Sequence, residues 1–143
     1  MDLPILPPDY RPSDKEPYMS PLQLAYFRQK LVQWKADLLN ESEDTLAALQ
    51  EQSLSTPEAV ERASMETDHA FELRARDRAR KLINKIDQAI LRIEADEYGY
   101  CEETGDPIGL RRLEARPIAT MTIDAQERHE RAEKLHRDER RMT

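Results

Sequence analysis

Two long helical stretches separated by a proline-containing break constrain the fold of this chain more than any other feature. The first stretch begins at Ser20-Pro21 and the second at Thr56-Pro57, and Gln23 completes a capping box in the first. A side-chain N-cap followed by proline is a typical helix start. Each stretch has roughly 35 residues, or about 50 Å of helix at 1.5 Å per residue. Because so few residues join them, we expect an antiparallel hairpin.

Apolar residues recur at intervals of three and four along the first stretch and along the later half of the second, the spacing of a coiled-coil seam. Beyond Leu38 the seam weakens, with Glu41 in an inward position. The pattern predicts an all-α fold with a coiled-coil hairpin over residues 20–96, tightly packed at its base and loosely packed toward its tip near 54–63. The seam residues are Leu24, Phe27, Leu31, Trp34 and Leu38 in the first stretch, and Leu82, Ile86, Ala89 and Ile93 in the second.

The remaining residues form two shorter segments. Residues 1–19 contain five prolines and are expected to pack on the body as a leader, either weakly or as a strap held by Ile5 and Leu6. Residues 97–143 should form a small globular body followed by a C-terminal helix. With 36% charged and 6% aromatic residues, any compact core must be small, and three glycines argue against a sheet protein with many turns.

Within the body, Gly99 is expected to end the second long helix. The last helix is predicted to start at Asp124, with Glu127 completing a capping box, and to run to about Arg141. The small core of the body is expected from Ile108, Leu110, Leu113, Ile118 and Ile123, and a thin stripe of Ala125, Ala132 and Leu135 should pack the last helix on it.

Charge is segregated along the hairpin. Residues 41–70 hold eight acids against Arg62 alone, whereas residues 71–92 hold seven basic residues against three acids. One interpretation is an ordinary solvated helix surface; the other is a probe with an acidic end and a basic stem. The net charge of −7 disfavours general DNA or membrane-surface binding. With one cysteine, no secretory signal and no long apolar run, we expect a cytoplasmic protein.

The segment from Tyr98 to Pro117, YGYCEETGDPIGLRRLEARP, resembles the zinc-finger region of the DksA/TraR family. The similarity extends back through ELRARDRARKL from Glu72 and QLAYFR from Gln23, and covers roughly residues 18–125. It implies a transcription regulator of the stringent response that inserts its hairpin into the secondary channel of bacterial RNA polymerase, against the β-prime subunit, and acts with ppGpp. It also implies a monomeric non-enzyme that does not bind DNA directly.

The resemblance assigns roles to individual positions. Glu58, Glu61 and Ala63 match the tip that faces the polymerase active site, although the family has aspartates where this chain has glutamates. Arg78 matches a stem residue that contacts the polymerase rim. The positions matching the ppGpp site are Leu82, Lys85, Arg112, Arg116 and Gln126, the last of which is lysine in the family.

Three of the four family zinc ligands are replaced. The ligand positions read Cys101, Thr104, Thr122 and Ala125, and one thiolate cannot supply the four ligands of structural zinc. We therefore expect a zinc-independent protein with no tightly bound cofactor. Cys101 is either a remnant held in the body or an oxidisable thiol; Glu102 and Glu103 are expected to raise its pKa and blunt its reactivity.

Two other functions are compatible with parts of the pattern. Glu58 and Glu61 could share a catalytic Mg²⁺ inside the polymerase, as in a transcript-cleavage cofactor. Alternatively, the chain could be a coiled-coil scaffold that dimerises through the seam from Leu24 to Trp34. Independent catalysis is not expected, because the sequence has no nucleophile triad, Gly-rich phosphate loop or metal cluster.

Overall fold

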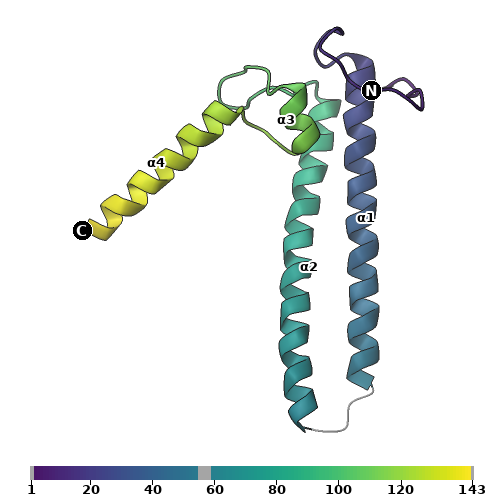
Figure 1. The fold of residues 1–143 in the computed structure, drawn as a ribbon, viewed down its shortest axis with the longest axis vertical. Helices are drawn as coiled ribbons and strands as arrows, with labels where there is room; N and C mark the ends of the chain where they lie inside the picture. The colour runs from purple at the N-terminus through teal and green to yellow at the C-terminus, as the bar shows by residue number, and fades with distance from the viewer. Residues whose placement is uncertain (1, 55–58, 143) are drawn as a thin grey trace. The chain divides into compact units, whose positions relative to one another are not determined.

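The computed structural model describes residues 2–54 and 59–142, which form four α-helices and one isolated β-bridge between Tyr100 and Pro107. The predicted all-α fold is confirmed (Figure 1). Two of the helices are long and two are short. They are α1 (Pro21–Leu54), α2 (Ala59–Glu94), α3 (Leu110–Ala115) and α4 (Ile123–Met142).

The start of α1 follows the predicted capping pattern. The Gln23 backbone N–H donates to the Ser20 hydroxyl at 3.3 Å, so Ser20 is the N-cap. The Gln23 amide is fully buried and bonds in two directions: its oxygen accepts from the Met19 N–H at 2.8 Å, and its nitrogen donates to the Ser13 carbonyl at 3.2 Å. The Gln23 side chain therefore holds the preceding loop, whereas the N-cap N–H that a capping box would bond donates to the Pro17 carbonyl instead.

The helices α1 and α2 run antiparallel and side by side (Figure 1). An ion pair between Lys35 Nζ and Asp87 Oδ1 at 2.7 Å joins them. Six of the nine predicted seam residues are buried, and Trp34, Leu38 and Leu82 are half-buried. The seam opens further along, where Leu46 is 38% and Phe71 59% exposed. The inward position predicted for Glu41 is wrong: Glu41 is exposed and Ser42 is half-buried instead. Buried seam residues are Leu24, Phe27, Leu31, Ile86, Ala89 and Ile93.

The C-terminus of α2 differs from the prediction. The helix ends at Glu94, and Asp96, not Gly99, is the first residue to adopt a left-handed conformation, with φ of 62°. The Glu97 N–H donates to the Arg92 carbonyl at 2.8 Å and the Asp96 N–H to the Ile93 carbonyl at 3.2 Å, which together make a Schellman motif. Aspartate tolerates this conformation better than most residues do.

The chain divides into two compact units. We call residues 30–88 the hairpin unit and residues 1–29 with 89–143 the body unit. In the body unit the ring of Phe27 packs against that of Tyr98, with centroids 5.7 Å apart, and the Tyr98 hydroxyl donates to the Pro117 carbonyl at 2.7 Å. Both side chains are buried, as are Ile108 and Leu113. Burial raises the pKa of Tyr98, so its hydroxyl stays a hydrogen-bond donor.

The N-terminal leader contacts the body through tyrosines. Ile5, a predicted anchor of the strap, is 95% exposed, so that expectation is wrong. The Tyr18 hydroxyl instead donates to the Gly99 carbonyl at 2.7 Å and accepts from the Gly109 N–H at 2.9 Å. The Tyr10 ring packs edge-on against Tyr26, with 6.2 Å between centroids. Aromatic rings with a polar end suit such partly buried contacts.

The N-cap of the C-terminal helix lies two residues before the predicted one. The Ala125 N–H donates to the Thr122 hydroxyl at 3.2 Å, so Thr122, not Asp124, is the N-cap of α4. Ala125 is fully buried, but Ala132 is exposed, Leu135 is 64% exposed and Ile123 is 54% exposed. The predicted packing stripe is therefore limited to its first residue, and Ile123 does not join the core. The six-residue α3 was not expected from the sequence.

Over the two described ranges, no helix combines the length and apolar character that a membrane span requires.

Candidate functional site

Among the three predicted tip residues, only Ala63 lies wholly within the described part of the chain. Ala63 is exposed near the start of α2, and its carbonyl accepts a hydrogen bond from the Thr67 hydroxyl at 3.2 Å. Glu58 lies outside the described residues, and so does the side chain of Glu61. The tip assignment stays a prediction.

The helical geometry of α2 places three predicted residues on one face. Arg78, Leu82 and Lys85 are separated by four and three residues, so they are neighbours on the helix surface. Arg78 and Lys85 are exposed and Leu82 is half-buried. The arrangement offers two cations beside an apolar side chain, which suits contact with an acidic protein surface or with phosphates.

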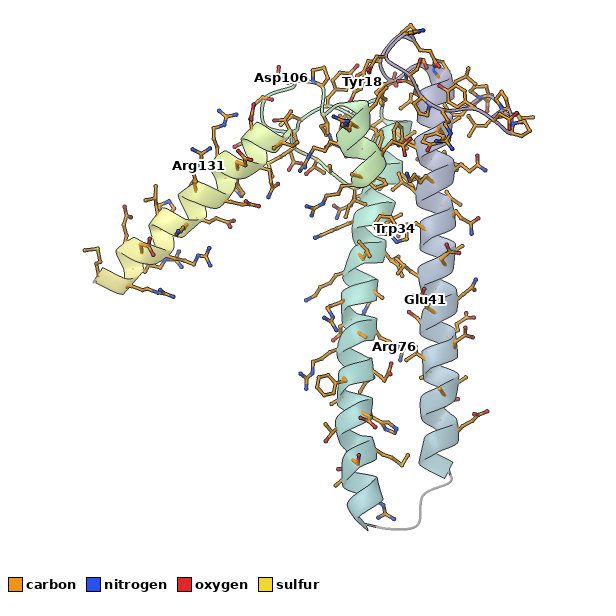
Figure 2. The ribbon with its side chains drawn as sticks, viewed as in Figure 1. Tyr18, Trp34, Glu41, Arg76, Asp106 and Arg131 are labelled. Carbon is orange, nitrogen blue, oxygen red and sulfur yellow. The ribbon has the colours of Figure 1, made fainter. Side chains whose placement is uncertain are left out.

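A hollow of about 600 Å³ lies between α1 and α2 in the hairpin unit. Arg76 and Trp34 are both seen between the two helices in Figure 2. Apolar and charged side chains share the hollow, and an ion pair joins Arg80 to Asp77 within it. The residues matched to polymerase or ppGpp contacts lie elsewhere, because the lining consists of Leu39, Ser42, Leu73, Arg76, Asp77, Arg80 and Ile83.

The other three residues of the predicted ppGpp site belong to the body unit. Arg112, in α3, is half-buried, and its Nε donates to the Met121 carbonyl at 3.0 Å. Arg116 follows α3 and is exposed. Gln126 lies in the first turn of α4, where its amide donates to Glu130 at 3.1 Å. Arg112 therefore has a structural contact in addition to any role in binding.

The four positions that match the zinc ligands come together. Cys101 is 3% exposed, and its sulfur accepts hydrogen bonds from the Thr104 hydroxyl and from the backbone N–H groups of Thr122, Thr104 and Glu103. Thr122 in turn caps the helix that carries the buried Ala125. The two halves of this segment thus meet at a single sulfur.

Comparison with known proteins agrees with this geometry. Residues 23–93 match the profile described as DnaK suppressor protein DksA, N-terminal domain, and residues 96–131 match the prokaryotic dksA/traR C4-type zinc finger. A protein of Caulobacter vibrioides named RNA polymerase-binding transcription factor DksA is 60% identical over 131 residues, covering 92% of both chains. The chain belongs to the DksA family.

Two further DksA proteins support the assignment. The Escherichia coli K12 protein of the same name is 44% identical over 115 residues, which are 80% of this chain and 76% of that one. The solved structure of transcription factor DksA2 from Pseudomonas aeruginosa has a TM-score of 0.77 and 40% identity, covering 82% of this chain and 90% of that chain. Sequence and fold therefore point to the same family.

The C4-type description of the DksA finger implies zinc, but the residues at this site do not fit the metal. Structural zinc requires four thiolate or imidazole ligands in a tetrahedron. Here the four ligand positions carry one thiol, two threonine hydroxyls and a methyl group. Across residues 2–54 and 59–142, no group of three or more histidine, cysteine, aspartate or glutamate side chains could hold a metal ion.

The expectation that nearby glutamates raise the pKa of Cys101 is wrong. Burial of the thiol raises its pKa, but the hydrogen bonds from Thr104 and the three backbone N–H groups outweigh it and lower the pKa from 9.0 to about 7. The Glu102 carboxylate is engaged elsewhere, with Thr120 and Arg92. Whether Cys101 is oxidised in the cell stays a prediction.

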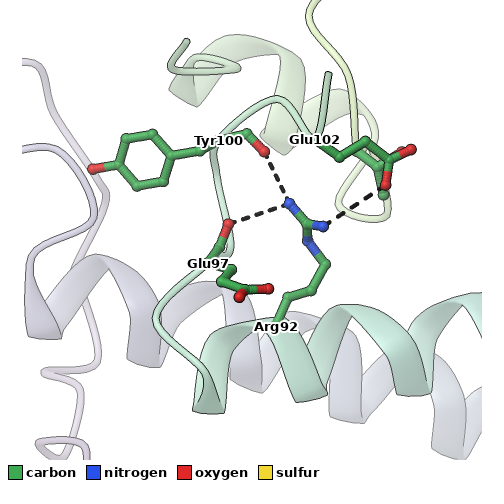
Figure 3. A network of polar contacts seen from close by, with 5 residues as sticks. Arg92, Glu97, Tyr100 and Glu102 are labelled. Atoms are coloured by element: carbon green, nitrogen blue, oxygen red, sulfur yellow. Dashed lines mark hydrogen bonds and ion pairs between the residues drawn. The ribbon is translucent and has the colours of Figure 1, made fainter. Parts of the chain in front are cut away.

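Sequence reasoning missed two residues that hold this part of the DksA fold together. Tyr18 joins the leader to the backbone of Gly99 and Gly109. Arg92, in the last turn of α2, contacts three residues of the loop that follows (Figure 3). A basic residue in the last turn of a helix is a recognisable signal, since it can bond the last carbonyls. A tyrosine in a proline-rich leader carries no comparable signal.

Proposed function

We propose that this DksA-family protein is a transcription regulator that binds bacterial RNA polymerase. The observation that carries the proposal is the 60% identity, over 92% of both chains, with a protein named RNA polymerase-binding transcription factor DksA. The fold is consistent with it: the two long helices have 34 and 36 residues, each about 50 Å long at 1.5 Å per residue. Such a hairpin is long enough to reach into a channel of a large enzyme.

We further propose that the hairpin enters the secondary channel against the β-prime subunit. In this proposal Glu58, Glu61 and Ala63 approach the active site and Arg78 contacts the rim. The exposure of Ala63 and Arg78 supports it, because neither side chain is used in packing. The loosely packed seam toward the tip also supports it, because side chains there can adjust to a partner without giving up many apolar contacts within the hairpin.

We propose ppGpp as the effector. Lys85, Arg112 and Arg116 provide cations for a polyphosphate, and arginine can hold phosphate oxygens with two parallel hydrogen bonds. Gln126 replaces a family lysine, so the affinity for ppGpp should be lower than where that charge is present. The regulator is proposed to be a cytoplasmic, monomeric non-enzyme that does not bind DNA directly.

Zinc independence is the last part of the proposal. It rests on the donor set around Cys101, which lacks three of the four ligands. The apolar residues of the body and its hydrogen bonds must then supply the stability that metal provides in a zinc finger.

In vitro transcription from a ribosomal RNA promoter tests the function directly. Wild-type protein should change transcript yield, and ppGpp should enlarge the change. Glu61→Asn should remove the effect while leaving polymerase binding intact, because the proposed tip residue acts after docking. Glu66→Asn is the matched control, since Glu66 is an exposed acid on the same helix outside the proposed tip.

Two outcomes would contradict the proposal. Wild-type protein that leaves transcription unchanged with and without ppGpp would remove the regulatory function. Protein that is not retained by immobilised polymerase would remove the partner. Cleavage of backtracked RNA that disappears with Glu61→Asn would favour a cleavage cofactor instead.

A further inference from the structure

The loop segment between α2 and α4 has little regular secondary structure, and separate backbone hydrogen bonds, such as that from the Cys101 N–H to the Asp106 carbonyl, pair part of it. Among the described residues of this segment, regular structure is limited to the six residues of α3 and the Tyr100–Pro107 bridge. Backbone carbonyls that leave water nevertheless need donors. In this body unit, side chains supply several of them: Tyr98 bonds Pro117, Arg112 bonds Met121 and Tyr18 bonds Gly99.

Arg92 makes the densest set of these contacts (Figure 3). Its Nη2 donates to the Tyr100 carbonyl at 2.9 Å and to the Glu97 carbonyl at 3.2 Å. Its Nη1 lies 3.8 Å from a carboxylate oxygen of Glu102. Its own backbone carbonyl accepts from the N–H groups of Glu97 at 2.8 Å and Tyr98 at 3.1 Å. One residue therefore holds the loop from both its side chain and its main chain.

Glu102 extends this connection to the second half of the finger. The Glu102 N–H donates to the Thr120 carbonyl at 2.9 Å, and the Thr120 hydroxyl donates to the Glu102 carboxylate at 3.3 Å. Thr120 lies two residues before the Thr122 cap of α4. A continuous polar path thus runs from α2 through the residues on both sides of Cys101 to the start of α4.

The two carbonyl contacts should matter more than the ion pair. The Glu102 side chain is 52% exposed, and exposed ion pairs contribute little to stability. The Arg92 side chain is only 21% exposed, and both of its hydrogen bonds join a charged donor to a backbone carbonyl, which makes them stronger than bonds between neutral groups. Lysine cannot reproduce the geometry, because it lacks the planar fork that reaches several acceptors at once.

We infer that Arg92 is the residue that fixes the Cys101 loop onto α2, in the place where a C4-type finger relies on metal ligation. The inference rests on the proposed zinc independence of this protein and adds to it the residue that replaces the metal. It assigns no ligand to the site. The clamp consists of Arg92 and the groups that it holds, the carbonyls of Glu97 and Tyr100 and the Glu102 side chain, which Thr120 connects to the start of α4.

Hydrogen exchange of the full-length protein, measured residue by residue, tests this role. Arg92→Lys should speed exchange roughly tenfold or more at amides paired within the loop that Arg92 holds, because losing the charge-assisted hydrogen bonds to two backbone carbonyls makes local opening easier. Three amides serve as probes. The Cys101 N–H donates to the Asp106 carbonyl, the Glu102 N–H to the Thr120 carbonyl, and the Ile108 N–H to the Gly99 carbonyl. Amides of the hairpin unit should keep their wild-type rates, whereas a general loss of stability would raise exchange in both units.

Arg111→Lys is the matched control. Arg111 is exposed on α3, and its side chain makes no hydrogen bond or ion pair with the described residues, so the same chemical change there should leave exchange unaltered. Should Arg92→Lys fail to fold, Glu102→Ala tests the next link of the path. It keeps the two carbonyl bonds of Arg92, so its effect at the Glu102 amide should be smaller than tenfold.

The outcomes separate the two proposals. If the loop amides exchange at the same rate in Arg92→Lys as in Arg111→Lys, and EDTA does not change their rate in wild type, the proposed role of Arg92 is wrong and zinc independence stands. If EDTA alone speeds exchange of the loop amides in wild type, zinc independence fails and the clamp fails with it. A Glu102→Ala effect of tenfold or more would overturn the central place of Arg92. These exchange measurements do not depend on whether a variant retains transcriptional activity.

Discussion

At the scale of single residues, Cys101 shows how a metal-ligand position can persist as a hydrogen-bonded thiol. Its sulfur is surrounded by donors from both knuckles, and these lower its pKa to about 7. Threonine at positions 104 and 122 has a physical reason in each case: one hydroxyl bonds the sulfur and the other caps α4. Hydrogen bonds from both halves of the segment thus surround the one thiol at the family's ligand positions.

Titration of Cys101 should therefore have its midpoint near pH 7, against 9.0 for an ordinary thiol. A group whose pKa is lower in the folded state stabilises the fold above its unfolded pKa. The free energy of unfolding should accordingly rise as the pH increases from about 7 to about 9 and fall when the pH is lowered over the same range. Cys101→Ser should lack this part of the pH dependence, because it has no thiol to titrate.

Ultraviolet absorbance of the thiolate gives the midpoint, and urea unfolding at several pH values gives the slope. Thr104→Val removes the side-chain donor, so its midpoint should lie above that of wild type. A wild-type midpoint at or above 9 would contradict the hydrogen-bond argument.

Gly99 is a second position at which the surroundings restrict which residue can be accommodated. Its φ is +91°, and an added Cβ would lie 2.7 Å from the sulfur of Met19. Gly99→Ala should cost about 1–3 kcal/mol, since it combines a strained backbone with a side-chain clash.

Gly105→Ala is the control that measures the cost of backbone strain without a side-chain clash. Gly105 also has positive φ, +78°, but open space around its Cβ position. Thermal unfolding should rank Gly99→Ala as the more destabilising variant, and equal losses would contradict a role for the Met19 contact.

At the scale of elements, packing of the long helices is concentrated at residues that the heptad spacing identified. Phe27→Ala should destabilise the protein by about 3–5 kcal/mol, because its ring is fully buried against Tyr98. Phe71→Ala should change stability by less than about 1 kcal/mol, since that ring is 59% exposed and has Arg74 above it at 5.1 Å. Urea unfolding measures both, and similar losses would refute the difference in packing along the hairpin.

The same elements show what sequence could and could not predict. The seam and the Ser20 cap were predictable because apolar spacing and capping chemistry are local. The end of α2 was not, because Asp96 took the left-handed position that glycine was expected to take. The cap of α4 was ambiguous, since Thr122 and Asp124 are both good capping residues. Tyr18 was missed because it contacts residues that only the fold brings close to it. Arg92 contacts residues close to it in sequence and has the local signal of a basic residue in the last turn, but that signal does not say which loop residues it holds.

At the scale of the whole molecule, charge distribution should control association with the proposed partner. The exposed cations Arg78 and Lys85 share one face of α2. If that face contacts polymerase, Arg78→Glu combined with Lys85→Glu should weaken binding by about tenfold or more, or about 1.4 kcal/mol. The loss should grow at low ionic strength, because screening weakens attraction between exposed charges as salt is added.

Arg131→Glu provides the comparison, because Arg131 is an exposed arginine on α4 (Figure 2). A general effect of net charge would weaken binding in this variant too, at about half the strength of the double reversal. A specific contact through α2 predicts near wild-type affinity for Arg131→Glu and a much smaller salt dependence for the α2 variant. Polymerase affinity measured at several salt concentrations distinguishes the general charge effect from the specific contact. Equal losses of affinity per reversed charge in the two variants would show that this face of α2 does not contact polymerase.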